Sequence, residues 1–266
     1  MNLRRSLIAA GVIFTLASGR LSAALIALDD FNYASGGDLN GQSGGGSFGF
    51  SDAWTGNSTF DIGNGSLVSP VSQAPGVGNR MSAASYSANR DIHRTLTAPL
   101  GAPGTTNYFS FLLQPNGLLH EGFAQGWFGF VLSGGFPVYV DMGSFTNKYG
   151  IEVSGTSSLS STTATIGQTV FVVLRIDFSG GGVDPARIYI NPLPGNEPVV
   201  ASAAVLENGI GSVTTVGLTG PGAYSFDTLK IGTSWADVAP VPEPSTLALA
   251  PLGTLALWAI NRRLRN

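Results

Sequence analysis

Few residues of this chain have the types and spacing that enzyme chemistry requires. His93 and His120 are the only histidines and cysteine is absent, which excludes a three-histidine metal centre and a thiolate nucleophile. Asp91 and His93 would share one face of a strand, where we interpret them as a surface ion pair. The serines, Ser133 before two glycines among them, lack a nucleophile-elbow pattern. The sequence therefore does not favour a serine hydrolase.

Acidic residues are also poorly placed for glycoside hydrolysis, which needs two carboxyl groups about 5 to 10 Å apart. Asp29 and Asp30 are close neighbours, but adjacent residues of a strand point to opposite faces. Acids from different strands could still meet in space, and these are Glu121, Asp141, Glu152 and Asp177. We expect solvated or hydrogen-bonded surface acids, and hence no enzyme. A secreted hydrolase that acts on polysaccharide is the alternative.

Glycine runs and aromatic residues complete the candidates for binding chemistry. The runs at 44–46 and 180–182 are followed neither by Lys-Ser/Thr nor by a helix, so we predict loops rather than phosphate sites. Exposed aromatic rings would indicate sugar binding. The tryptophans between the two termini are Trp54, Trp127 and Trp235, and we expect most of the rings of these residues and of the tyrosines to lie in the core. The sequence does not decide which face carries Phe128 and Phe130.

Short apolar runs separated by turn residues must position these side chains. Several runs have the length and period of strands: 108–114, 126–132, 137–142, 148–153, 169–178, 186–191 and 224–231. The run 169–178 is apolar on both faces until Arg175 and Asp177, as in a central strand. Asn-Gly pairs begin at Asn40, Asn64, Asn116 and Asn208 and favour tight turns. We predict an all-β fold, an antiparallel β-sandwich of the jelly-roll type.

Composition agrees with a single domain rich in strands and turns. The chain has 37 glycines and only 11% charged residues. Between Leu25 and Glu243, seven basic residues stand against sixteen acidic ones, a net charge near −9, which excludes nucleic acid as an expected partner. A domain of this length can be stable without disulfides.

The first 24 residues have the pattern of a secretory signal peptide. Arg4 and Arg5 precede an apolar run from Leu7 to Ala17, and small residues follow at Ser22-Ala23-Ala24. We predict an N-terminal signal helix that signal peptidase removes after Ala24, with cleavage after Ala27 as the alternative. The sandwich domain then spans 25–239.

The last residues, 240–266, form a three-part tail. Val241-Pro242-Glu243-Pro244-Ser245 should be extended and accessible to an enzyme. The charge-free residues 245–260 would span roughly 24 Å as a helix, slightly less than a hydrocarbon core of about 30 Å. Arg262, Arg263 and Arg265 follow and would stay on the cytoplasmic side. We predict a transient transmembrane helix in the inner membrane.

Together, the export signal and the tail resemble the PEP-CTERM proteins of Gram-negative bacteria. The resemblance implies a membrane transpeptidase-like enzyme, exosortase, as partner, with Pro242, Glu243 and Pro244 as the recognised residues. It also implies export across the inner membrane, then a place at the cell surface or in an extracellular polysaccharide matrix.

The domain itself resembles concanavalin-like, laminin-G-like domains. The resemblance rests on 28–33, 39–42 and 53–54 at its start, and on 173–178, 188–192 and 226–235 at its end. In that fold the first and last strands lie side by side. The resemblance implies a possible calcium ion at Asp29, Asp30 and Asp227.

The resulting hypothesis is a surface or matrix protein whose sandwich binds glycan or exopolysaccharide, or has a structural role. A flat ice-binding or adhesive face is a third hypothesis, because such faces carry Thr-x-Thr ladders. Residues 161–165 supply only one short approximation to such a ladder.

Overall fold

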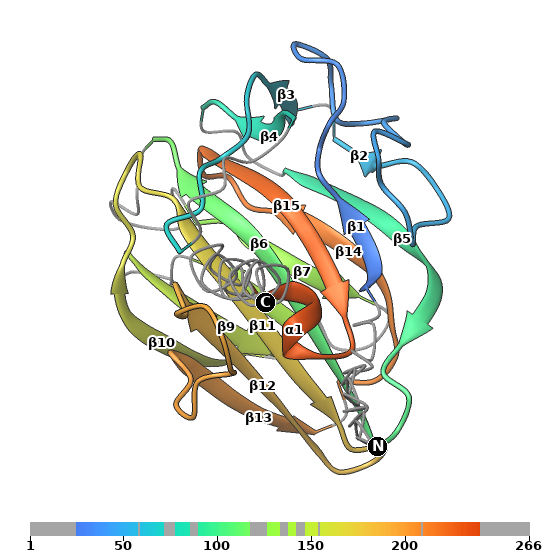
Figure 1. The fold of residues 1–266 in the computed structure, drawn as a ribbon, viewed down its shortest axis with the longest axis vertical. Helices are drawn as coiled ribbons and strands as arrows, with labels where there is room; N and C mark the ends of the chain where they lie inside the picture. The colour runs from blue at the N-terminus through green and yellow to red at the C-terminus, as the bar shows by residue number, and fades with distance from the viewer. Residues whose placement is uncertain are drawn as a thin grey trace, which may run out of the picture.

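Alternation of buried and exposed side chains builds two antiparallel sheets that pack face to face (Figure 1). The computed structural model describes residues 25–57, 59–71, 78–85, 90–117, 127–133, 138–141, 147–153, 155–208 and 210–239. These residues form strands and one short helix, which confirms the predicted all-β sandwich. The predicted signal segment 1–24 and tail 240–266 lie outside the described residues. No helix among the described residues is long and apolar enough to cross a membrane.

The first sheet has the order β13-β12-β11-β6-β15-β4-β3, and β1 also pairs with β15. Antiparallel β1 and β4 thus share one edge of β15, while β6 pairs with the other edge. The strands are β1 (Leu25–Asp29), β3 (Asp61–Gly63), β4 (Arg80–Ala83), β6 (Thr105–Pro115), β11 (Val170–Phe178), β12 (Val183–Ile190), β13 (Ala203–Asn208) and β15 (Tyr224–Gly232).

The second sheet has the order β10-β9-β8-β7-β14-β5-β2. Its strands are β2 (Thr55–Gly56), β5 (Asp91–Leu100), β7 (Gly129–Ser133), β8 (Val138–Asp141), β9 (Lys148–Val153), β10 (Thr156–Thr163) and β14 (Val213–Thr219). All seven strands predicted from apolar runs are present in the two sheets. Phe128 and Phe130 both lie in the core between the sheets, which decides the orientation that the sequence left open.

Strand β11 is the central strand that its sequence predicts. Val172, Leu174 and Ile176 point into the main core between the sheets, where each buried side chain contributes about 1.5–3 kcal/mol. Phe171 and Val173 point the other way, into a smaller apolar cluster on the outer face of the first sheet. That outer cluster explains why β11 is apolar on both faces.

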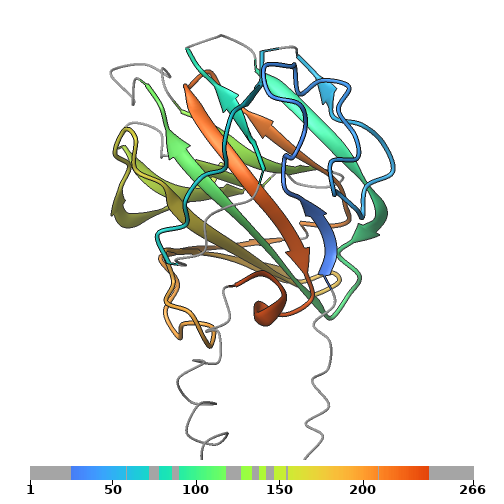
Figure 2. The same cartoon turned by 45° about the horizontal axis from the view of Figure 1, so that its top comes forward.

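The outer cluster lies under α1 (Trp235–Val238), which follows β15 directly. Ser110 of β6 donates a hydrogen bond to the carbonyl of Val238 at 2.9 Å, which fixes the end of the helix on the sheet. The indole N–H of Trp235 donates to the carbonyl of Gly195 at 2.9 Å, so α1 also holds the loop between β12 and β13. Figure 2 shows this loop and α1 at the same lower end of the sandwich as the start of β1.

A buried ion pair joins β1 to the second sheet. Asp29 at the end of β1 is fully buried, and its Oδ2 lies 2.7 Å from Nη1 of Arg94 on β5. The same oxygen accepts hydrogen bonds from the hydroxyl of Tyr33 at 2.7 Å and from the indole of Trp54 at 2.9 Å. Oδ1 accepts from the backbone N–H of Phe31 at 2.9 Å. One carboxylate therefore positions three core aromatic residues.

We predict that Asp29→Asn lowers the free energy of unfolding by about 3–5 kcal/mol, because it leaves the buried guanidinium of Arg94 without its charge partner. Urea denaturation would measure the change. The control is Asp91→Asn, at an exposed position, where a change within about 0.5 kcal/mol is expected. Equal stability of the two variants would contradict this assignment.

Candidate ligand-binding site

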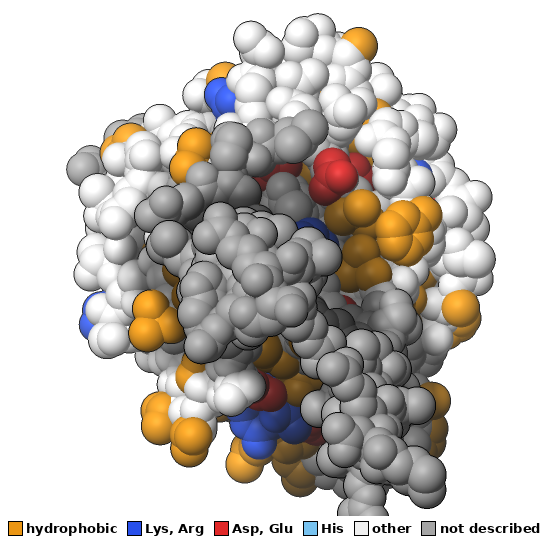
Figure 3. All heavy atoms as spheres, viewed as in Figure 1, with side chains coloured by type: hydrophobic (Ala, Val, Ile, Leu, Met, Phe, Trp, Pro, Cys, Tyr) orange, Lys and Arg blue, Asp and Glu red, His pale blue; other side chains and the backbone are white. Residues whose placement is uncertain are grey.

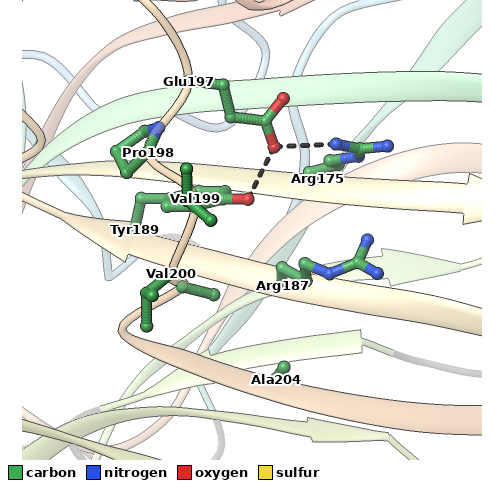
Figure 4. Close-up of a pocket in the computed structure, with 9 residues that line it drawn as sticks. Arg175, Arg187, Tyr189, Glu197, Pro198, Val199, Val200 and Ala204 are labelled. Atoms are coloured by element: carbon green, nitrogen blue, oxygen red, sulfur yellow. Dashed lines mark hydrogen bonds and ion pairs between the residues drawn. The ribbon is translucent and has the colours of Figure 1, made fainter.

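An open pocket of about 620 Å³ lies on the outer face of the first sheet (Figure 4). Strands β11, β12 and β13 form its floor, and the loop from residue 191 to residue 202 forms its wall. Its lining residues are Arg175, Arg187, Tyr189, Glu197, Pro198, Val199, Val200, Ala201 and Ala204. On the face shown in Figure 3, basic and acidic side chains gather below the centre, at the level of β12 and β13.

The register of β11 and β12 places two guanidinium groups side by side on the floor. Arg175 is directly opposite Arg187, and on its other side it is opposite Tyr108 of β6. Like charges at opposed positions repel each other, so carboxylates are required nearby. Asp177 supplies one: its Oδ1 lies 2.8 Å from Nη2 of Arg175, its Oδ2 pairs with Arg187, and Thr106 donates to Oδ1 at 2.7 Å.

Glu197 supplies the second carboxylate from the wall of the pocket. Its Oε1 lies 2.8 Å from Nη1 of Arg175 and also accepts a hydrogen bond from the hydroxyl of Tyr189. Its Oε2 accepts from the hydroxyl of Tyr108 at 2.9 Å. Glu197 thus attaches the loop to three strands of the sheet, β6, β11 and β12, beside the contact between Trp235 and Gly195.

Both carboxylates are held in their ionised form. Burial opposes ionisation of Glu197, but hydrogen bonds from Tyr189, Arg175 and Tyr108 outweigh it and lower the pKa of Glu197. Burial is likewise outweighed at Asp177, whose pKa is lowered by hydrogen bonds from Thr106, Arg175 and Arg187. Burial and the bond to Glu197 raise the pKa of Tyr108 to about 12. At neutral pH the site therefore contains two cations and two anions.

The four charged side chains are fixed yet accessible. Between 20% and 33% of each side chain is exposed, with Arg187 the most exposed. Arg187 has one carboxylate partner, and its other N–H groups have no hydrogen-bond partner among the described residues. The site can thus donate to a ligand oxygen through Arg187 and accept from a ligand hydroxyl through carboxylate oxygens.

The structure confirms that the first and last strands pair, but it does not bring the three predicted calcium ligands together. Asp29 lies opposite Leu229 and faces the core, where all its contacts are to protein donors. Asp227 lies opposite Leu112 and faces the outer side of the same sheet, where it binds the backbone N–H of Leu67 at 2.8 Å. Burial raises the pKa of Asp227 to about 6.

Asp29 and Asp227 therefore lie on opposite faces of one sheet and cannot bind one ion with Asp30. The described residues contain no group of three or more histidine and acidic side chains that could hold a metal.

The scattered acids do not converge in the described structure. Asp177 pairs with two arginines that line the pocket, whereas Glu152 is on the outer face of the other sheet, between Tyr139 and Ser157 in register. Glu121 and the side chain of Asp141 lie outside the described residues. Asp91 and His93 share the exposed face of β5, but the described residues show no ion pair between them, so that prediction is wrong.

Sequence reasoning missed the residues that make the pocket. The alternation of Arg187 and Tyr189 placed both on one face of a strand, and Arg175 and Asp177 ended the apolar run of another. These alternations were a usable signal for a charged outer face. Glu197 lies in an irregular loop, where no periodicity indicates what its side chain contacts. The prediction that most aromatic rings lie in the core is confirmed for Trp54 and Trp235, which are 0% and 8% exposed, whereas Trp127 is partly buried.

Fold and site thus define a two-layer antiparallel β-sandwich with an open, charged pocket on one outer face. No family model matches the sequence, and no curated protein matches it.

Solved structures with a similar fold include an endo-β-1,4-glucuronan lyase from the fungus Trichoderma reesei, at 12% identity and TM-score 0.47, covering 77% of this chain and 97% of that one. A domain of an extracellular arabinanase from Geobacillus stearothermophilus is 13% identical with TM-score 0.45, covering 80% and 93%. A carbohydrate-binding module from Bacillus subtilis is 9% identical with TM-score 0.37, covering 65% and 95%. Similarities this low carry no argument about activity.

We predict that the loop detaches from the sheet at acidic pH because Glu197 becomes protonated. Glu197→Gln should no longer show this pH-dependent change. Because the folded-state pKa of Glu197 is lowered, its contribution to stability is present above the ordinary pKa of 4.5 and is lost as pH falls through the lower folded value. In the unaltered protein, acidification in that range should detach the loop and change the fluorescence of Trp235. The variant should lack this pH-dependent change, whereas an unaltered acid transition in the variant would contradict the assignment.

Proposed function

We propose that the protein is exported and sorted to the cell surface or extracellular matrix, and that its sandwich binds glycan through the pocket on the first sheet. The observation that carries the binding proposal is the partly exposed network of Arg175, Asp177, Arg187 and Glu197. Four charged side chains gather there in a chain with only 11% charged residues.

The chemistry of the network suits sugar hydroxyl groups, each of which both donates and accepts hydrogen bonds. The guanidinium of Arg187 can donate to a hydroxyl oxygen while a carboxylate oxygen accepts from the neighbouring hydroxyl. The ion pairs hold these groups in place before a ligand arrives, which reduces the entropic cost of binding. Pro198 and Val199 on the wall add apolar contact for the C–H face of a sugar.

A polysaccharide hydrolase is the alternative, and the site does not favour it. Glycoside hydrolysis requires one carboxyl group that remains protonated and acts as general acid. The pKa values of Asp177 and Glu197 are both lowered, so neither is suited to donate that proton. Release of reducing ends from a polysaccharide by the purified protein, and its loss in Glu197→Ala, would instead favour the hydrolase.

Glycan binding should depend on Arg187. A screen of polysaccharides by calorimetry or retention should identify a polymer that binds saturably. Arg187→Ala should then weaken binding at least about tenfold, the loss of roughly one charge-assisted hydrogen bond. Lys148→Ala, a loss of equal charge in the other sheet, should leave the affinity unchanged. Equal affinity of the unaltered protein and Arg187→Ala would contradict the proposed site.

Export and sorting are proposed from the two ends of the chain. Signal peptidase would cleave after Ala24, and an exosortase-type enzyme would recognise Pro242, Glu243 and Pro244 while residues 245–260 lie in the membrane. Replacing those three residues by alanine should abolish surface display in a host with the enzyme, as measured by antibody labelling of intact cells. Arg187→Ala should be displayed normally, since it leaves the tail unchanged. Normal display of the triple variant would contradict this sorting route.

A further inference from the structure

The wall of the pocket exposes apolar side chains that no described residue covers. Val199, Leu193 and Val200 are 102%, 81% and 80% exposed, the three highest values among the large hydrophobic residues of the described chain. All three belong to the loop between β12 and β13. An exposed apolar group of this kind is typical of a surface that contacts an apolar partner.

The loop cannot easily fold these side chains back onto the sheet. Glu197 is attached to β6, β11 and β12 through its three partners. The carbonyl of Gly195 is bound by Trp235, and the hydroxyl of Ser202 accepts from the backbone N–H of Ile190 at 2.9 Å. The fixed contacts on both sides of Val199 hold the loop in the conformation that leaves this side chain exposed.

The loop also lies beside the place where the chain leaves the sandwich. The last described residue, Ala239, follows α1, whose Trp235 contacts the loop. Pro242 is three residues further, at most about 10 Å along an extended chain, and Ser245 is at most about 20 Å away. No long linker separates the folded domain from the apolar residues 245–260.

We propose that this loop rests on the lipid bilayer while the tail is inserted, with Leu193, Val199 and Val200 in the interfacial layer. The proposal rests on the membrane insertion of residues 245–260 proposed above. The short connection keeps the end of the sandwich that carries α1 near the membrane, and the loop carries the most exposed large hydrophobic side chains of the described residues. Because Val199 and Val200 also line the pocket, processing of the tail would leave the pocket open to glycan.

Single-cysteine labelling tests this contact, because the chain has no cysteine of its own. Full-length Val199→Cys would carry a nitrobenzoxadiazole fluorophore and be reconstituted in phosphatidylethanolamine and phosphatidylglycerol vesicles. We expect a blue shift and quenching by lipid-attached spin labels. Thr97→Cys, exposed on β5 in the other sheet, should keep an aqueous spectrum. Leu255→Cys reports separately whether the tail enters the bilayer.

A second variant tests whether the loop contacts the lipid because the connection between the sandwich and the tail is short. A long Gly-Ser linker inserted between Ala239 and Pro240 should return the Val199 label to an aqueous spectrum while the Leu255 label stays in the lipid. A membrane-embedded Leu255 label with an aqueous Val199 label in the unaltered chain would overturn the inference alone. An aqueous Leu255 label would overturn the proposed insertion as well. A blue shift at Val199 without vesicles would indicate a protein partner, such as a second copy, and would also overturn it.

Discussion

The ion pair between Asp29 and Arg94 is the interaction on which the arrangement of the molecule depends. It is buried between the two sheets and joins β1 of one to β5 of the other. By ending β1 at a fixed point in the core, it sets the register in which β1 pairs with β15. The end of β15 then determines where α1 lies, and Trp235 of α1 holds the loop that walls the pocket. A contact in the core thus positions a site on the outer surface.

Strand β11 shows how one short sequence serves both the core and the site. Its inward residues pack between the sheets, while its outward residues change from apolar to charged along the strand. The apolar half supports α1, and the charged half forms the floor of the pocket. Because the same strand is central in its sheet, the charged residues rest on a rigid base, which favours a site that is formed before a ligand binds.

The sequence allowed the fold class and seven strands to be predicted, because those strands contain aliphatic or aromatic runs. Strands such as β10 (Thr156–Thr163) and β14 (Val213–Thr219) were missed, since serine and threonine are as common in turns as in exposed strands. Pairing of the first and last strands was expected, but the direction of Asp29 was not. Its partner Arg94 is 65 residues away, and no local pattern reveals such a pair. Glu197 was missed for the same reason, because its partners come from three other segments.

We propose that the charged network on β11, β12 and the following loop is a binding site for glycan and not only a means of attaching the loop. Hydrogen–deuterium exchange of the full-length protein, with and without a polysaccharide that it binds, tests this claim directly. We expect protection on binding to be concentrated in residues 173–178 and 186–204. Protection confined to the outer face of the second sheet, with none in those two segments, would contradict it.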